Sequence, residues 1–414
     1  MKNRFFTLLF ALMAISIPQH IYAILVDGIN YRFNSSDKTA EVYGEWTAYG
    51  QTYHYSGDIV IPEYVTYQGE NYAVTSIGFR AFAYMYDAIT SVTLPSTLTS
   101  INGMAFYRCS GLTSITIPAA VDYIGGSSFD GCSALRTVTF LGTNAIYFEN
   151  DAFQNCSQLQ KVEIQDLPSW CRHQFRNVDS NPLYSAKHIY MNNAEITRLV
   201  IPEGITTISN YAFLNCTFVT SLSLPSTIDS IAWNSFSGCS FVKIDLADLA
   251  AFCKAETSSI LRYTQRLFAS GTAIRNLVIP DNVDSISAGT FAQGTMLTSV
   301  TIPNSVTYIG DNAFSGCTAI QQIKVYATTP PQIYSKTFLN INLDVPVYVP
   351  MQSLNAYQND DLWGLMNLIG IVEDNTAIDN IYQYDKKDTK IFINGHVYIL
   401  RDDKIYTVTG MEVK

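Results

Sequence analysis

Residues 295–317 read TMLTSVTIPNSVTYIGDNAFSGC, and closely similar stretches return along most of this 414-residue chain. Each copy contains a Phe, usually preceded by Ala and followed three residues later by Cys. These residues are Phe82, Phe106, Phe129, Phe153, Phe213, Phe236, Phe291, Phe314 and Phe338. The steps between them are 24, 23, 24, 60, 23, 55, 23 and 24 residues. A fixed period near 23 predicts a solenoid, in which each repeat buries its apolar edge by stacking on its neighbours.

Within one repeat, apolar and polar residues alternate before a proline. Ile115 and Ile117 are separated and preceded by hydroxyl residues, the period of a strand with one buried face. Pro118 lacks an N–H group, so it ends the strand. The stretch 310–317 has room for one helical or 3₁₀ turn that carries the Phe and Cys inward. We therefore expect each coil to hold a strand, a corner, a second short extended piece and a tight turn, with strands of successive coils paired in parallel.

This pattern resembles the BspA-type leucine-rich repeats of secreted and surface proteins from Bacteroides-like bacteria. The family wording SLTSVTIPxSVTSIGxxAFxGC is close to residues 295–317, and the resemblance runs from about Gly57 to Asp374. It implies a β-rich α/β repeat fold, a right-handed leucine-rich-repeat solenoid with a parallel strand face. It also implies roles in attachment and protein recognition, and no catalytic residues.

Two long gaps interrupt the period, at residues 165–200 and 247–278. Both begin with Asp-Leu-x-x-aromatic-Cys, at residues 166–171 and 248–253. The resemblance implies an irregular, more helical coil in each gap. We expect each insert to be a divergent coil of the solenoid and not a domain boundary.

The N-terminal end has the pattern of a secretory signal peptide over residues 1–23. Lys2 and Arg4 precede the apolar stretch 5–17, and a small-residue cleavage site ends at Ala23. This predicts an exported protein, either secreted or held at the cell surface. Removal of these residues would change the formal net charge from −10 to about −12, because it takes two basic residues and no acidic one. An acidic chain is a poor match for nucleic acid or anionic lipid, and no membrane span is predicted after the signal peptide.

The remaining segments flank or close the solenoid. Residues 24–75 do not fit the repeat, alternate like strands, and are predicted to be an N-terminal β cap. Residues 76–374 are predicted to be the solenoid with a closing C-terminal coil, and 375–389 a polar linker. Residues 390–414 predict a hairpin or meander around Asn394-Gly395. This last segment is similar to short C-terminal β segments of exported proteins, some of which direct sorting or anchoring, but a plain β appendage is favoured over that role.

The cysteines follow the repeat. Six of the eight lie three residues after a repeat Phe: Cys109, Cys132, Cys156, Cys216, Cys239 and Cys317. We expect a buried ladder of free thiols that act as small apolar fillers. Export permits disulfides between neighbouring rungs, but parallel Cβ vectors fit disulfide geometry poorly.

The sequence offers no pattern for catalysis or cofactor binding. It has no metal-ligand spacing, phosphate loop or nucleophile elbow. Cys171 and His173 are close in sequence, and core packing of Cys171 is favoured over a nucleophile. The chain is therefore predicted to be no enzyme and to need no metal or cofactor.

The outward positions of the strand face are where we expect a partner to bind. The face is expected to be one continuous sheet, lined by hydroxyl groups near its ends and by charges in its middle. The candidate partner-binding residues are Lys161, Glu163, Arg198, Lys243, Asp245, Gln322 and Lys324. The hydroxyl rows have a simpler interpretation as filler, since Thr favours exposed strand positions.

The leading hypothesis is an exported, non-enzymatic protein that recognises another protein, such as a host extracellular protein, or mediates adhesion at the bacterial surface. The first rival is a glycan-binding protein of the same fold, suggested by the many Tyr residues of the cap, although half-buried packing within the cap is the favoured interpretation of these residues. An enzyme or enzyme accessory is the second rival, and a structural surface-layer component is the third.

Overall fold

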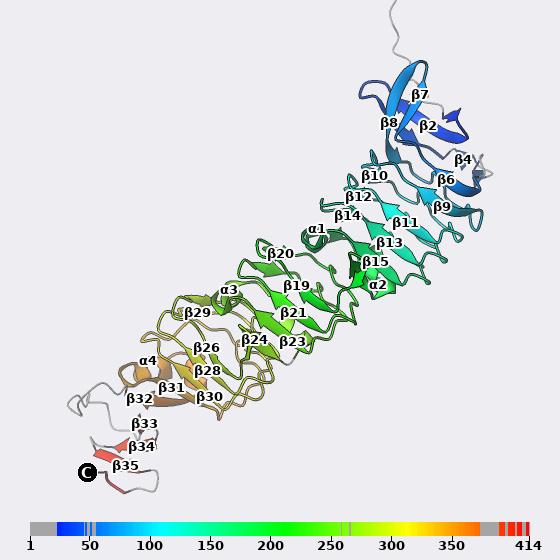
Figure 1. Cartoon of the computed structure of the whole chain (residues 1–414). Helices are drawn as coiled ribbons and strands as arrows, with labels where there is room; N and C mark the ends of the chain where they lie inside the picture. The colour runs from blue at the N-terminus through cyan, green and yellow to red at the C-terminus, as the bar shows by residue number, and fades with distance from the viewer. Residues whose placement is uncertain are drawn as a thin grey trace, which may run out of the picture.

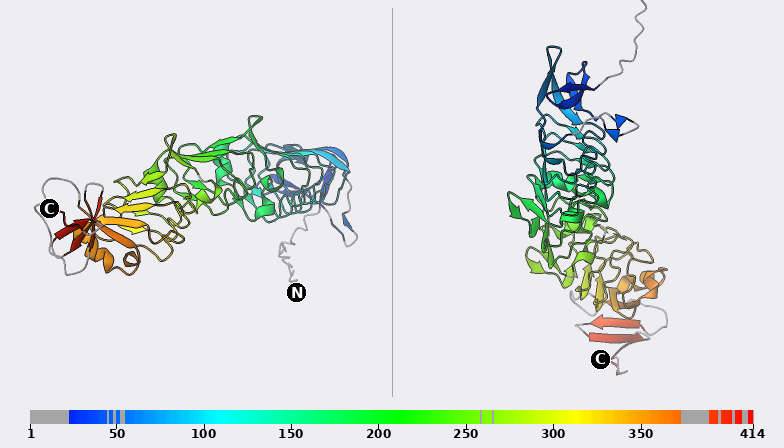
Figure 2. Two further views of the ribbon diagram at one scale, coloured as in Figure 1. Left: turned by 90° about the horizontal axis from the view of Figure 1, so that it is seen from below. Right: turned by 90° about the vertical axis from the view of Figure 1, so that its right-hand side faces the viewer.

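The computed structural model of the chain is an elongated, gently curved rod with its N-terminal and C-terminal segments at opposite ends (Figures 1 and 2). The described residues are 23–44, 46–47, 50–51, 55–257, 259–264, 266–372, 389–393, 396–401, 404–407 and 411–413. The predicted signal peptide lies outside them apart from Ala23, and the predicted linker lies outside them apart from Thr389.

Each coil of the rod contains two extended pieces joined by turns. In one coil, β28 (Ser299–Ile302) stops at Pro303, and the two-residue strand β29 (Tyr308–Ile309) follows. A turn then buries Phe314 and Cys317 completely. The coil predicted from the repeat is confirmed.

The longer strands lie next to one another on one side of the rod, which we call the strand face (Figure 1). They are β9 (Ile89–Thr93), β11 (Ser114–Ile117), β13 (Thr137–Phe140), β15 (Lys161–Ile164), β19 (Arg198–Val200), β21 (Ser221–Leu224), β23 (Lys243–Leu246), β26 (Asn276–Val278), β28 and β30 (Gln322–Val325). Parallel pairing keeps buried positions in register, so that Ile115 pairs with Val138 and Val138 with Val162. Side chains alternate between core and solvent, as the period of two requires.

Two-residue strands form the opposite side of the coils. They are β10 (Ser100–Ile101), β12 (Tyr123–Ile124), β14 (Tyr147–Phe148), β16 (Gln174–Phe175), β20 (Thr207–Ile208), β22 (Ser230–Ile231), β27 (Ser285–Ile286) and β29. Gly125 directly follows β12, where the preceding coil passes close by. A Cβ atom on Gly125 would lie 2.3 Å from the backbone nitrogen of Gly103, so only glycine fits this position.

The core is built from the repeat Phe and Cys side chains. The rings of Phe82, Phe106 and Phe129 stack with centroids 5.2 Å apart at each step. The Cys132 thiol donates a hydrogen bond to the backbone oxygen of Phe106, one coil earlier, at 3.2 Å. The same bond joins Cys109 to Phe82, Cys156 to Phe129, Cys239 to Phe213 and Cys317 to Phe291. All eight cysteines lie in the described part of the chain, where they are buried and free, as the thiol ladder predicted.

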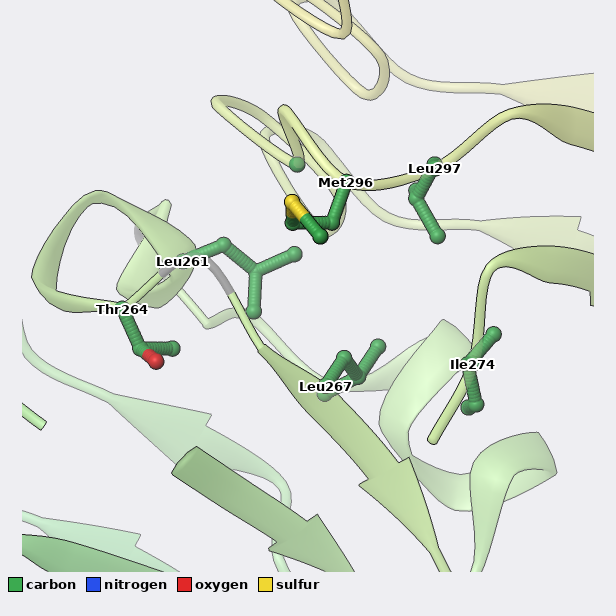
Figure 3. A pocket seen from close by; sticks show the side chains of 7 residues that line it. Leu261, Thr264, Leu267, Ile274, Met296 and Leu297 are labelled. Carbon is green, nitrogen blue, oxygen red and sulfur yellow. The ribbon is translucent and has the colours of Figure 1, made fainter. Parts of the chain in front are cut away.

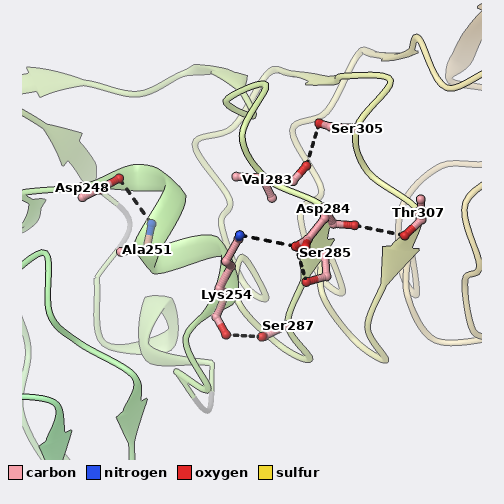
Figure 4. Close-up of polar contacts among 9 residues, drawn as sticks. All are labelled: Asp248, Ala251, Lys254, Val283, Asp284, Ser285, Ser287, Ser305 and Thr307. Carbon is pink, nitrogen blue, oxygen red and sulfur yellow. Dashed lines mark hydrogen bonds and ion pairs between the residues drawn. The ribbon is translucent and has the colours of Figure 1, made fainter.

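Each insert begins with a short capped helix. The first contains α1 (Leu167–Arg172), β16 (Gln174–Phe175), η1 (Val178–Ser180), α2 (Leu183–Ala186), β17 (Ile189–Met191) and β18 (Ala194–Glu195). The second contains α3 (Leu249–Lys254), η2 (Ile260–Tyr263), β24 (Leu267–Ala269) and β25 (Thr272–Ala273). Asp166 caps α1 by accepting the Ser169 N–H. Asp248 caps α3 by accepting the N–H groups of Ala250 and Ala251, and Figure 4 shows the contact with Ala251. The Asp of the shared insert motif is therefore a helix cap.

The expectation of one continuous strand-face sheet is wrong. Strand β17 extends the sheet by pairing in parallel with β15, but β18 folds back antiparallel through Asn192 and Asn193. Both turn residues have positive φ (54° and 62°), as a two-residue type I′ turn requires. The second insert repeats this with β24 and β25. Because each return strand ends a ladder, the strand face of the described residues is divided into separate sheets.

At the N-terminal end, several strands extend the sheet on the side opposite the strand face. β1 (Ile24–Val26), β2 (Ile29–Asn34), β3 (Thr39–Val42), β7 (Tyr64–Tyr67) and β8 (Glu70–Ile77) form a sheet that β10 extends, and β4 (Trp46–Thr47) pairs with β5 (Gly50–Gln51). β6 (Gly57–Val60) pairs in parallel with β9. The strand-face pattern therefore already starts at Gly57, inside the segment expected to be the cap.

At the C-terminal end, a last coil carries two buried aromatic anchors. It contains β31 (Pro346–Pro350), η3 (Met351–Ser353), α4 (Leu354–Gln358), η4 (Trp363–Leu365) and β32 (Asn367–Ile371). Tyr357 and Trp363 donate hydrogen bonds to the backbone oxygens of Ala327 and Pro331, both at 2.8 Å. β33 (Thr389–Ile393) pairs in parallel with β32, and β34 (His396–Arg401) and β35 (Lys404–Thr407) follow antiparallel. The predicted turn at 394–395 lies outside the described residues.

Candidate functional site

The predicted partner-binding residues all lie on the strand face, but on different sheets. Lys161 and Glu163 are on β15, in the sheet that β18 closes. Arg198 is on β19, and Lys243 and Asp245 are on β23, in the sheet that β25 closes. Gln322 and Lys324 lie on β30, nearer the C-terminal end. The candidate site is thus spread along the rod and is not one cluster.

The first lysine–acid pair, Lys161 and Glu163, is engaged with the first insert. The Lys161 Nζ lies 2.9 Å from Glu163 Oε2 and 4.8 Å from the ring centre of Tyr190 on β17. Glu163 Oε1 accepts the backbone N–H of Asn193 at 2.8 Å. The Glu163 side chain is only 10% exposed, less than an outward position predicts. This carboxylate holds the turn of the β17–β18 hairpin.

The second lysine–acid pair, Lys243 and Asp245, has the same arrangement. The Lys243 Nζ lies 3.5 Å from Asp245 Oδ2 and 5.1 Å from the ring centre of Phe268 on β24. Asp245 Oδ1 accepts the backbone N–H of Gly271, in the β24–β25 turn, at 3.2 Å. Each insert hairpin therefore rests on a lysine, an acid and an aromatic ring from adjacent strands.

Sequence reasoning missed the partners of these pairs. Tyr190 and Phe268 lie directly beside Glu163 and Asp245 in the strand register. Their signal in the sequence is weak: the two-residue turns 192–193 and 270–271, each flanked by short apolar runs. Recognising these turns as hairpins would have placed the aromatic residues beside the charges.

The other predicted residues do not contact an insert hairpin through an ion pair or a hydrogen bond in the described part of the chain. Arg198 is exposed, and Gln322 and Lys324 are half-buried. Within the described chain, their side chains have no hydrogen-bond or ion-pair partner. Next to Arg198, Val200 is 57% exposed, because β19 starts a sheet with no strand on its outer edge. These groups are free to meet a ligand.

Cys171 and His173 lie in the core of the first insert. Burial raises the pKa of the Cys171 thiol to about 12 and lowers the pKa of His173 to about 3. The neutral His173 ring accepts the backbone N–H of Ile146 through Nδ1 at 3.1 Å. An activated nucleophile needs the opposite shift of the thiol pKa, so the pair is suited to packing. No group of three or more His, Cys, Asp or Glu side chains among the described residues is arranged to hold a metal ion.

Within the described part of the chain, no helix is long and apolar enough to cross a membrane.

Comparison with known proteins identifies the repeat. A family model described as the BspA type leucine rich repeat region, in six copies, matches residues 66–181, 186–293 and 263–353. None of the curated proteins matches the chain.

Solved structures similar to the chain include leucine-rich-repeat proteins of several bacteria. One is a leucine-rich cell surface protein from Faecalibacterium prausnitzii, with 20% identity over 84% of this chain and 94% of that one and a TM-score of 0.37. Another is a leucine-rich repeat protein from Bacteroides ovatus, with 22% identity, coverage of 85% and 82% and a TM-score of 0.37. The pneumococcal vaccine antigen PcpA shows 17% identity, coverage of 84% and 98% and a TM-score of 0.41. Because the family model matches more than half of its residues, the chain belongs to the BspA-type leucine-rich repeat family.

Proposed function

We propose that this protein is an exported, non-enzymatic recognition protein that binds another protein through its strand face at the bacterial surface. The membership of a repeat family associated with protein binding and adhesion supports this role. The description of one similar structure as a cell surface protein supports the location. The signal-peptide pattern of residues 1–23 supports export.

The observation that carries the proposal is the set of unpaired side chains on an otherwise regular face. Arg198, Gln322 and Lys324 project from parallel strands without ion-pair or hydrogen-bond partners among the described residues. The exposed Val200 beside Arg198 adds apolar surface. Binding through an extended repeat face depends on area and charge complementarity more than on one pocket.

In this proposal the two lysine–acid pairs shape the face. Lys161–Glu163 and Lys243–Asp245 hold the hairpins that end two of the sheets. A partner would contact them as a rim around Arg198, and their charges would contribute to its orientation.

The test is binding of residues 24–414 to a panel of purified extracellular-matrix and serum proteins. We expect the double variant Arg198→Glu, Lys324→Glu to weaken the captured interaction about tenfold, because two unpaired cations on the contact surface are reversed. The control is Arg176→Glu, since Arg176 is exposed beside β16 on the opposite side of the coils.

Unchanged affinity in the double variant would reject the strand face as the contact surface. An equal loss of affinity in Arg176→Glu would show that net charge, and not a site on the strand face, controls binding. Failure of the whole panel to bind would reject these classes of partner.

A further inference from the structure

The second insert forms one wall of a cleft of about 530 Å³. Its polar lining is provided by Ser240, Arg262, Tyr263, Thr264, Arg266, Gln293 and Thr295. The described lining contains two arginines and no acidic side chain, although the whole chain has a formal net charge of −10. This volume is in the range of small-ligand sites, roughly 300–1,000 Å³. A positive cleft on an acidic protein attracts anions locally.

The second insert, which lines the cleft, has a shorter connection than the first. Residues 173–188 connect α1 to β17 in the first insert, whereas 255–266 connect α3 to β24 in the second, four residues fewer. The longer connection includes β16, η1 and α2, whereas the described part of the shorter one includes η2 and a single bridge residue, Glu256. Leu261 and Thr264 of the cleft lining also border a separate small cavity of about 10 Å³, together with Met296 and Leu297 (Figure 3).

Arg262 is held in place at the edge of the cleft. Its guanidinium lies 3.9 Å from the ring centre of Trp233 and 4.7 Å from that of Tyr263. One terminal nitrogen, Nη2, donates to the Trp233 backbone oxygen and to Tyr263 Oη. Nη1 and Nε have no hydrogen-bond partner among the described residues. An arginine fixed through one edge presents its other edge to a ligand with little loss of rotamer entropy.

Arg266 supplies a second cation without a protein partner. Its side chain is exposed, lines the same cleft and makes no ion pair or hydrogen bond with any described residue. Two guanidinium groups in one cleft favour a ligand that carries carboxylate or sulfate groups, because these oxygens match the paired N–H groups of arginine.

We propose that this cleft binds an acidic saccharide, a sugar chain bearing carboxylate or sulfate groups. The arginines would bind the acidic group, while Ser240, Gln293 and Thr295 offer hydroxyl and amide groups that both donate to and accept from sugar hydroxyls. The aromatic groups nearest the arginines are Tyr263, in the lining, and Trp233, a residue 60% exposed that packs on Arg262. Aromatic rings of this kind pack against sugar C–H groups. An acidic peptide would use the arginines but has less use for these aromatic faces.

The test is calorimetric titration of residues 24–414 with four probes: a heparin-derived hexasaccharide, hexagalacturonate, cellohexaose and hexaglutamate. We expect at least one of the two acidic sugars to bind at least tenfold more tightly than cellohexaose and hexaglutamate, and its binding to weaken with added salt. We expect the Arg266→Ala substitution to weaken binding of that sugar about tenfold. The fold should stay intact, because the Arg266 side chain has no hydrogen-bond or ion-pair partner among the described residues. Arg275→Ala is the matched control, since Arg275 is exposed at the start of β26 and does not line the cleft.

Several outcomes would overturn the proposal. Absence of binding by both acidic sugars, or equal binding of cellohexaose, would exclude an acidic-saccharide site. Equal binding of hexaglutamate would assign the cleft to acidic peptides. Full affinity in Arg266→Ala, or the same loss in Arg275→Ala, would place the binding elsewhere on the protein.

Discussion

The cysteine of each repeat combines two roles in one small side chain. Cys109 fills core space completely removed from solvent, and its thiol donates to the backbone oxygen of Phe82 at 3.1 Å. Serine would keep the donor but bury a more polar group, while alanine would leave the Phe82 oxygen without this donor. Burial raises the pKa of the Cys109 thiol from 9.0 to about 12. The thiol therefore stays protonated in the folded state at pH values where it ionises in the unfolded chain.

This shift predicts a pH-dependent cost for Cys109→Ala. Near neutral pH the variant should lose about 1–2 kcal/mol of unfolding free energy, for the lost packing and hydrogen bond. Above pH 9 the unfolded wild type binds fewer protons than the folded one, so its stability falls as pH rises toward 12. The variant lacks this pH-dependent loss of stability, so the difference should move in its favour by about 1.4 kcal/mol per pH unit between 9 and 11, which cancels the deficit and leaves the variant the more stable of the two by pH 11. Urea unfolding from pH 7 to 11 measures the difference.

Leu112→Ala is the matched control, because Leu112 is equally buried near Cys109 and does not ionise. Its deficit should stay constant over the same pH range. A constant deficit in Cys109→Ala as well would contradict the protonated, buried thiol.

At the scale of elements, the insert helix α3 has a capping hydrogen bond at its first turn and an exposed ion pair at its last residue, and we expect the first to stabilise the protein more than the second (Figure 4). Asp248 accepts the Ala250 N–H at 2.7 Å and caps the helix. Lys254 pairs with Asp284 at 3.4 Å, but their side chains are 45% and 72% exposed. We expect Asp248→Ala to cost about 1 kcal/mol of unfolding free energy and Lys254→Ala less than about 0.5 kcal/mol. Thermal unfolding compares them, and Asp248→Asn should recover most of the loss because Asn also caps helices.

The opposite order of the two costs would contradict this account of the insert. A salt series distinguishes the contacts further, because the Lys254–Asp284 pair is exposed and screened. Added salt should remove the small effect of Lys254→Ala and leave most of the effect of Asp248→Ala.

The repeated coils could be predicted from the sequence, but the breaks between sheets could not. A repeat of 23 residues fixes the buried positions of every coil, so strands such as β11 and β28 fall where alternation places them. The breaks depend on the turns 192–193 and 270–271, whose conformation is a property of two residues each. The partners of Glu163 and Asp245 come from strands about 25 residues later, and a period offers no information about such contacts. The sequence therefore predicted the correct face for the candidate residues but not the residues that they contact.

At the scale of the whole molecule, a continuous core runs through discontinuous sheets. The buried hydrophobic cluster extends from Ile29 to Trp363. At the first insert, Trp170 donates to the Ala212 backbone oxygen at 2.7 Å, and the Ser209 N–H binds the Cys171 oxygen. The Ser287 N–H binds the Cys253 oxygen in the same way at the second insert. The coils thus stay in contact across each insert, but the strand-face ladder and the stacked Phe series both stop there.

This arrangement predicts that damage spreads within a segment more than across an insert. Phe129 is fully buried and stacks on Phe106 and Phe153 at 5.2 and 5.0 Å. Phe129→Ala should cost about 3–5 kcal/mol, because it opens a cavity that neighbouring coils fill only in part. In a repeat array that cost acts mainly on nearest neighbours. We therefore expect amide hydrogen exchange to rise in β11, β13 and β15, while β28 and β30 keep their protection.

Phe314→Ala tests the same prediction in the C-terminal part of the rod. Phe314 stacks on Phe291 and Phe338 at 5.3 and 5.4 Å, beyond the second insert. Its removal should raise exchange in β28 and β30 and spare β11 and β13, at a similar total cost. Equal loss of protection along the whole rod in both variants would show instead that the side-chain and backbone contacts at the inserts couple all coils into one cooperative unit. Opposite patterns in the two variants would mean that the inserts divide the rod energetically as well as geometrically, so that a ligand bound to one segment would stabilise that segment first.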